Sequence, residues 1–196
     1  EKVKALGYPV KLGLEMDYIP ERQEEIRAFV NEFPFDYVLG AVHWLGDFGF
    51  DHPDCRNQWG QKNVDEVHRE YYNVLGKAIN SGVFDGIAHP DVIKVFGYKA
   101  QKDMGDIYEK IALAIKNKGL CAEVSTAGIR KPVGEIYPGA HLMSFFAKHD
   151  IPIMINSDAH CPEDVGRDFE KAMDYVRSFG YNKLYYFEKR SKKPIN

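Results

Sequence analysis

Apolar runs and amphipathic stretches alternate along the whole chain. Strand-length apolar runs occupy residues 10–16, 37–43, 83–89, 120–125, 151–156 and 183–188. Between them, apolar positions recur with helical spacing near 20–32, 64–81, 103–118, 138–149 and 168–179. Continuous apolar strands that alternate with amphipathic helices are typical of a parallel sheet covered by helices. The pattern therefore predicts an α/β domain, and we interpret the lysine-rich segment 189–193 as a solvated tail.

Five of these runs carry, at or close to their carboxyl ends, a residue that can bind a metal ion or transfer a proton. These residues are Glu15, His43, His89, Glu123 and the pair Asp158 and His160. Residues two apart on an extended segment point the same way, so Asp158 and His160 should emerge together. Functional residues of α/β barrels and open sheets gather at the carboxyl ends of the strands. The sequence thus predicts a metal or acid/base site, and favours a barrel over a doubly wound sheet.

Composition narrows the class of protein. The chain has 196 residues, 44% of them hydrophobic, which is enough for one domain with a substantial core. A net charge of -3 gives no electrostatic reason to expect nucleic acid or a membrane as partner. Cys55, Cys121 and Cys161 have no CxxC spacing and are expected to be free thiols in a reducing compartment. We therefore expect a cytoplasmic protein that acts on a small molecule.

Seven short motifs follow one another along nearly the whole chain. They are Gly13-Leu-Glu-Met-Asp-Tyr18, Gly40-Ala-Val-His-Trp-Leu45, Gly49-Phe-Asp-His-Pro53, Ala88-His-Pro-Asp91, Glu123-Val-Ser-Thr-Ala-Gly-Ile-Arg-Lys-Pro132, Gly134-Glu-Ile-Tyr-Pro138 and Ser157-Asp-Ala-His160. Together they resemble the histidinol-phosphate phosphatases of the polymerase and histidinol phosphatase (PHP) superfamily. The resemblance implies a distorted, TIM-like barrel of seven βα units with three metal ions. It also implies hydrolysis of L-histidinol phosphate to L-histidinol and phosphate in histidine biosynthesis.

The resemblance assigns roles to the strand-end residues. Glu15 corresponds to a carboxylate that bridges two ions, and His43 and His89 complete the shell of the second ion. Asp158 corresponds to a ligand of the first ion and His160 to a ligand of the third. Oxygen and imidazole ligands suit Zn, Mn or Fe. Glu15, Asp158 and His160 are accordingly expected to be catalytic, with either Asp158 or a water as proton donor to the leaving alkoxide.

Further residues are candidates for binding the substrate. By resemblance, Arg130 and Arg167 form a clamp for the phosphate, since guanidinium groups present paired donors to phosphoryl oxygens. Three roles are open for Glu123: it orients the substrate amine, holds a metal-bound water or forms a supporting hydrogen bond. His52, with its neighbour Asp51, lies in the long segment 44–63 and is a candidate contact for the substrate imidazole.

One family feature has no counterpart in this sequence. The family opens with a strand that ends in His-x-His, whereas no histidine here precedes Glu15. We therefore expect residues 1–196 to form a single PHP-type catalytic domain that lacks the first βα unit, holds fewer than three ions and tends to form homo-oligomers. Two alternatives stay open: a PHP phosphoesterase for another phosphate ester, and a catalytically impaired metal-binding PHP domain.

Overall fold

The computed structural model describes residues 5–195. Its strands are β1 (Gly13–Asp17), β2 (Tyr37–Ala41), β3 (Trp44–Leu45), β4 (Phe48–Gly49), β5 (Gly86–Ile87), β6 (Cys121–Ser125), β7 (Ile153–Asn156), β8 (Leu184–Glu188) and β9 (Ser191–Ile195). Its helices are α2 (Gln23–Glu32), α3 (Val64–Asn80), α4 (Gly105–Lys118), α5 (Ala140–Lys148) and α6 (Phe169–Ser178). The predicted alternation of strands and helices is confirmed.

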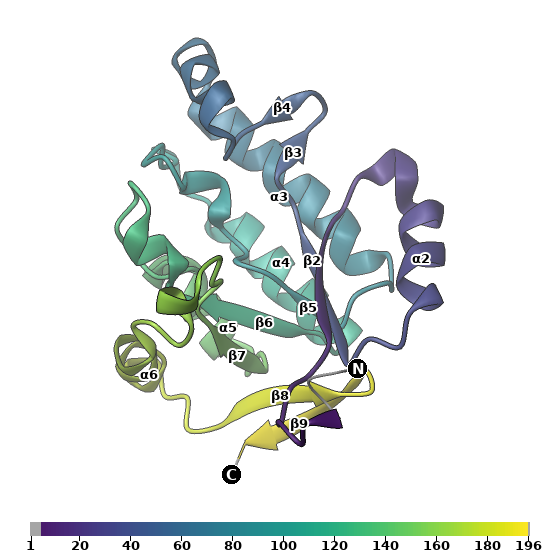
Figure 1. Cartoon of the computed structure of the whole chain (residues 1–196). Coiled ribbons are helices and arrows are strands. Elements are labelled where there is room, and N and C mark those ends of the chain that lie inside the picture. The colour runs from purple at the N-terminus through teal and green to yellow at the C-terminus, as the bar shows by residue number, and fades with distance from the viewer. Residues whose placement is uncertain (1–4, 196) are drawn as a thin grey trace.

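The main sheet is parallel and has the strand order β1-β2-β5-β6-β7. Strands that follow one another in sequence are therefore neighbours, with the short β3–β4 hairpin as an insertion. Right-handed crossovers between such neighbours place all the connecting helices on one side of the sheet. Figure 1 shows this arrangement, with α2 to α6 around the outside of a curved sheet. This sequential order differs from that of a doubly wound sheet, in which the strand order reverses at a switch point.

The sheet does not close among the residues that the structure describes. β1 and β7 are its two edge strands. The predicted strand 183–188 forms as β8, but it pairs antiparallel with β9 instead of joining the parallel sheet. The interpretation of 189–193 as a solvated tail was wrong, because Lys189 and Arg190 form the turn of this hairpin and Ser191 begins β9. Of the predicted TIM-like barrel lacking its first βα unit, the structure thus confirms an open α/β sheet.

Two groups of buried apolar side chains lie on opposite faces of the sheet. The larger group lies between the sheet and the helices. The buried face of α3 contributes Tyr71, Leu75 and Ile79 to this group. The smaller lies on the concave face and includes Leu39, Cys121, Met154 and, from β8, Phe187. The β8–β9 hairpin therefore covers one end of the concave face.

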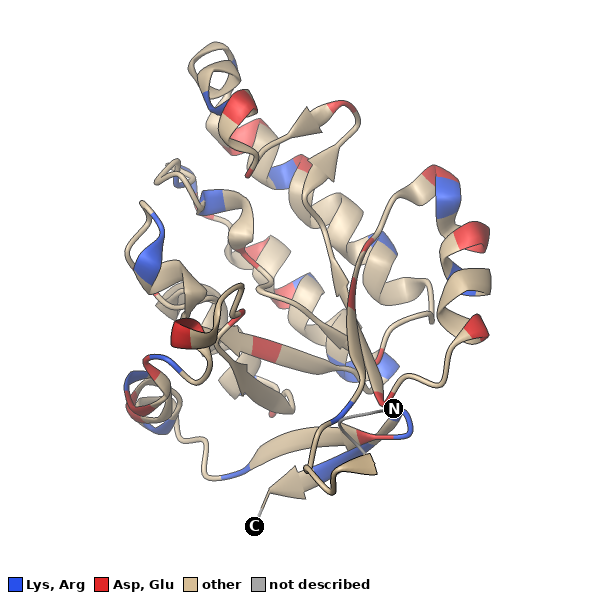
Figure 2. Cartoon of the chain, viewed as in Figure 1, with Lys and Arg blue, Asp and Glu red and all other residues tan. Residues whose placement is uncertain are grey.

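The hairpin covers the amino-terminal end of the strands. Arg190 donates its backbone N–H to the carbonyl of Asp36, just before β2, and its Nη2 to the carbonyl of Val83, before β5. The opposite, carboxyl end of the sheet is left for functional residues. Figure 2 shows basic and acidic positions mixed over the outer helices. None of the helices described is long and apolar enough to cross a membrane.

Candidate metal centre

Three predicted ligands meet at the carboxyl end of the sheet. Glu15 lies in the middle of β1, His43 two residues after β2, and His89 two residues after β5. Because these three strands are adjacent, the side chains converge. One possible ligand atom from each lies within 4.8 Å of the others. In the part of the chain that the structure describes, this is the group of three metal-type residues that is brought together.

The atoms of the group are arranged around one carboxylate oxygen. Glu15 Oε1 lies 3.1 Å from His89 Nε2 and 3.8 Å from His43 Nε2. The two imidazole rings have their centroids 5.0 Å apart. A carboxylate oxygen and two imidazole nitrogens are ligands that suit Zn²⁺ and related transition metals. The donor set therefore fits one such ion with open coordination positions.

Asp17 contacts one of the three candidate ligands and was not singled out by the sequence analysis. Its Oδ1 lies 2.7 Å from Nδ1 of His43, which leaves Nε2 of that ring facing Glu15. A carboxylate on the far nitrogen fixes the tautomer and the orientation of a ligating histidine. The signal was in the sequence, because Asp17 lies two residues after Glu15 on the same face of β1.

The proximity of these groups changes their protonation. Burial raises the pKa of Glu15, but the nearby His89 and His43 outweigh it and lower the pKa below its ordinary value. Burial lowers the pKa of His89, whereas the facing Glu15 carboxylate raises it, with a net value of about 10. Without metal, the pair therefore holds a proton between the two side chains. A metal ion that binds here must displace that proton.

Glu123 lies behind His89 on β6 and is 2% exposed. Its Oε2 accepts a hydrogen bond from the backbone N–H of His89 at 2.7 Å, and its Oε1 accepts one from Asn156 Nδ2 at 2.6 Å. Burial raises the pKa of Glu123, and the adjacent Glu15 raises it further, while His89 lowers it. Both carboxylate oxygens are thus held by protein donors.

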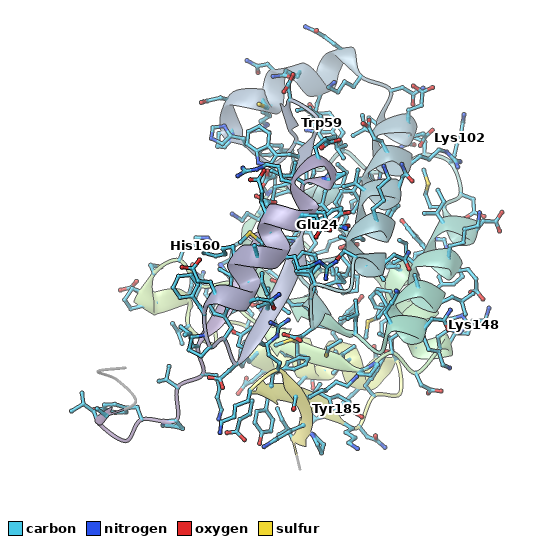
Figure 3. The ribbon with its side chains drawn as sticks, turned by 90° about the vertical axis from the view of Figure 1, so that its right-hand side faces the viewer. Glu24, Trp59, Lys102, Lys148, His160 and Tyr185 are labelled. Carbon is cyan, nitrogen blue, oxygen red and sulfur yellow. The ribbon has the colours of Figure 1, made fainter. Side chains whose placement is uncertain are left out.

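Asp158 and His160 lie beyond the end of β7 and outside the three-residue group. Asp158 has a positive φ of 48° and lines a cavity of about 400 Å³ on the concave face, together with Glu15 and Glu123. His160 is 83% exposed, and its Nδ1 lies 3.0 Å from the backbone oxygen of Asp158. Figure 3 shows His160 at the outer edge of the molecule.

The two arginines differ in burial although both approach Asp164. Arg130 is 14% exposed, donates Nη2 to the carbonyl of Ser157 at 2.6 Å and has its Nε 3.5 Å from Asp164 Oδ2. Arg167 is 53% exposed and places Nη1 2.9 Å from Asp164 Oδ1. Arg130 is therefore fixed beside the residue that precedes Asp158, whereas Arg167 is held mainly by a surface ion pair.

His52 is placed away from the converging ligands. It is 52% exposed, and its Nδ1 accepts a hydrogen bond from the backbone N–H of Asp54, at the start of the 3-10 segment Pro53–Gln61. Its neighbour Asp51 points toward the centre, with Oδ2 4.0 Å from His43 Nε2. The segment 44–63 is ordered, as predicted, and Trp59 packs in the core with Phe48.

Comparison with known proteins identifies the class. The PHP domain family matches residues 1–127, and the chain belongs to this family. A probable histidinol-phosphatase of Deinococcus radiodurans is 38% identical over 172 residues, which cover 87% of this chain and 65% of that protein. The histidinol-phosphatase of Lactococcus lactis is 26% identical over 181 residues, which cover 89% of this chain and 66% of that protein. The chain thus spans about two thirds of the length of these relatives.

A solved structure has the same fold. It is the crystal structure of histidinol phosphate phosphatase from Lactococcus lactis, complexed with zinc, L-histidinol and phosphate. The TM-score is 0.80 at 21% sequence identity, and the match covers 98% of this chain and 75% of that one. The likeness confirms the α/β architecture.

Proposed function

We propose that this protein hydrolyses L-histidinol phosphate to L-histidinol and phosphate with the help of divalent transition metal ions. The observation that carries the proposal is the convergence of Glu15, His43 and His89 at the carboxyl end of a PHP-type sheet. The relatives named histidinol-phosphatase support the choice of substrate. Zn, Mn and Fe all suit these ligands.

We propose that residues 1–196 form one PHP-type catalytic domain whose sheet is the larger part of a distorted seven-stranded βα barrel. The free edge of β1 and the cavity between β1 and β7 support this, because a further strand would pack there. A strand with ligands of its own at that position would complete the shells of the further ions. An open edge of this kind also favours self-association.

Every predicted site residue other than Glu123 has a place in this proposal. A bound divalent ion lowers the pKa of a coordinated water and offsets phosphoryl charge. Glu15, His43 and His89 hold one ion, and Asp158 and His160 contribute to the others. Arg130 and Arg167 hold the phosphoryl oxygens, and His52 is the candidate contact for the substrate imidazole. Asp158 is a candidate proton donor to the leaving alkoxide.

The experiment is phosphate release from L-histidinol phosphate by protein loaded with Zn, Mn or Fe. We expect the native protein to release phosphate and a chelator to stop the release. Glu15→Gln should also stop it, because the substitution removes the negative charge that faces both histidines. Glu70→Gln, on the exposed side of α3, is the matched control and should keep the activity. p-Nitrophenyl phosphate serves as an unrelated monoester, which should react more slowly. Equal release by native protein and Glu15→Gln would contradict the proposal.

A second function is favoured by one observation. Among the described residues a single group of three metal-type side chains comes together, which fits a domain that binds metal without turnover. The same assay separates the two functions. Stoichiometric metal binding without phosphate release from any ester would favour this alternative, and faster release from p-nitrophenyl phosphate would favour a different phosphate ester as substrate.

A further inference from the structure

His89 adopts a backbone conformation that is unfavourable for it. Its backbone φ is 23°, a positive value that residues other than glycine rarely adopt. Pro90 follows directly and narrows the conformations open to the preceding residue. Such a conformation persists only where surrounding contacts impose it. In this conformation Nε2 of His89 lies 3.1 Å from Glu15 Oε1, so the strained backbone and the convergence of the ligands go together.

Glu123 supplies the contact that reaches this backbone. Its Oε2 accepts the His89 N–H at 2.7 Å, a distance within the range of a well-formed hydrogen bond. Asn156 on β7 holds the other oxygen at 2.6 Å. Because β5, β6 and β7 are neighbours, the carboxylate joins three strands just below the candidate metal centre. The residue is 2% exposed, so water does not compete for these bonds.

We propose that Glu123 is a positioning residue for the metal centre, which holds the main chain of His89 so that its imidazole faces Glu15. Of the alternatives that the sequence left open for Glu123, this role is the supporting hydrogen bond rather than a contact with the substrate amine. The inference rests on the proposed function in one respect, that a metal ion binds at Glu15, His43 and His89. The proposed role depends on the length of the Glu123 side chain, which lets it reach the His89 N–H, and not on its charge.

Two conservative variants separate reach from charge. Glu123→Gln has the same length, so its amide oxygen can still accept the His89 N–H. Its amide nitrogen then faces Asn156, whose side-chain amide can flip so that its oxygen accepts the hydrogen bond. Glu123→Asp keeps the charge but is shorter by one carbon–carbon bond, about 1.5 Å, which takes the carboxylate out of hydrogen-bond range. A positioning role predicts that Gln works and Asp fails. An electrostatic role predicts the reverse.

The measurement is titration of metal-free protein with Co²⁺, followed by its visible absorption, which reports both affinity and coordination geometry. We expect Glu123→Gln to bind within about threefold of native protein, and Glu123→Asp to lose about 10- to 100-fold with an altered spectrum, as for changes behind a metal ligand. Glu70→Asp, the same shortening on the exposed face of α3, should bind like native protein. A Gln variant that loses more than about tenfold, or an Asp variant that loses nothing, overturns the proposal.

Controls separate this inference from the proposed function. If His43→Ala binds Co²⁺ as tightly as native protein, the metal is elsewhere and the metal centre itself is wrong. If Glu123→Asp fails to fold, Asn156→Leu replaces it, because it loosens the carboxylate without changing its charge. We expect that variant to lose at least about threefold in affinity, and unchanged affinity there overturns the positioning role.

Discussion

Two carboxylates on one strand contribute differently to the candidate metal centre. Glu15 presents an oxygen to both imidazoles, whereas Asp17, two residues on, is bonded to the far nitrogen of His43. The difference comes from what each carboxylate faces, since both project from the same side of β1. Sequence spacing identified Glu15 because it ends an apolar run, but it did not show which ring Asp17 would reach.

Asp17→Ala should therefore weaken metal binding without removing a ligand. The His43 ring would lose the partner that fixes its tautomer, and such losses cost about 10- to 100-fold in metal affinity. Competition with a chromophoric chelator measures the effect. Asp47→Ala, at the exposed turn between β3 and β4, is the matched control. Equal affinities for the two variants would show that Asp17 does not orient His43.

Arg130 should contribute more than Arg167 to the binding and turnover of the substrate. Its guanidinium is mostly buried and already fixed by the Ser157 carbonyl, so less freedom is lost when phosphate binds. Arg130→Ala should lower kcat/KM by about 30- to 1,000-fold, and Arg167→Ala by less. Steady-state kinetics on L-histidinol phosphate tests this, with the exposed Arg177→Ala as control. Native kinetics from Arg130→Ala would remove it from the clamp.

His68 should make stability depend on pH. Burial lowers the pKa of His68 below its ordinary 6.5, although the Tyr98 carbonyl and then Asp91 and Asp65 raise it in part. The unfolded chain therefore binds this proton more readily. The stability contribution is complete above pH 6.5 and is lost as the pH falls below it.

Urea unfolding of metal-free protein between pH 7.5 and about pH 5 measures this effect. We expect His68→Gln to lose less stability over that range than native protein does, since its amide can still donate to the Tyr98 carbonyl without titrating. His52→Gln, at an exposed position, should keep the native dependence on pH. Parallel curves for His68→Gln and native protein would contradict the prediction.

At the scale of elements, the sequence predicted which segments form but not all of their partners. Helices α3 and α4 and strands β2, β6 and β7 lie close to their predicted ranges, because apolar periodicity is a local property. The apolar pattern of 183–188 predicts a strand but does not specify which strand it pairs with. The segment pairs with β9 and does not join the parallel sheet. Lys189 and Arg190 both have positive φ, 49° and 62°, as a two-residue hairpin turn requires. Asn and Gly usually mark such turns, so this one was not recognised.

Arg190 ties this hairpin to the sheet. Its guanidinium bonds to Asp85, which is 12% exposed and also accepts the N–H of Val38 at 2.8 Å. Burial raises the pKa of Asp85, and Arg190 lowers it. Because Arg190 is itself 33% exposed, we expect Arg190→Ala to cost about 1–3 kcal/mol of unfolding free energy rather than the full cost of a buried charge.

Denaturant unfolding tests this cost, with Arg177→Ala in α6 as the matched surface control. Adding Asp85→Asn to the Arg190→Ala variant should recover part of the loss, since the neutral amide still accepts from Val38 but no longer buries a charge. A double variant less stable than Arg190→Ala alone would contradict this explanation.

For the whole molecule, the strand order and the open sheet determine which side chains meet at the candidate metal centre. Sequential order brings Glu15 on β1 together with His43 and His89, which follow the neighbouring strands β2 and β5, and the hairpin covers the opposite end of the sheet. Sequence analysis predicted that convergence because parallel strands share a carboxyl edge. Asp158 and His160 follow β7, at the other edge of the sheet, yet Asp158 lines one cavity with Glu15. The local spacing of Asp158 and His160 does not give the distance across that opening, so their part in the metal centre stays a prediction.

The number of metal ions held by residues 1–196 follows from this arrangement. One described group offers three ligands, so we expect about one tightly bound ion per chain after extensive dialysis. Elemental analysis of the dialysed protein gives the count. His43→Ala should reduce it toward zero, whereas His149→Ala, in the ion pair with Glu109 after α5, should leave it unchanged. Three ions per native chain would mean that Asp158 and His160 complete further sites from these residues alone, and the one-ion interpretation would then be wrong.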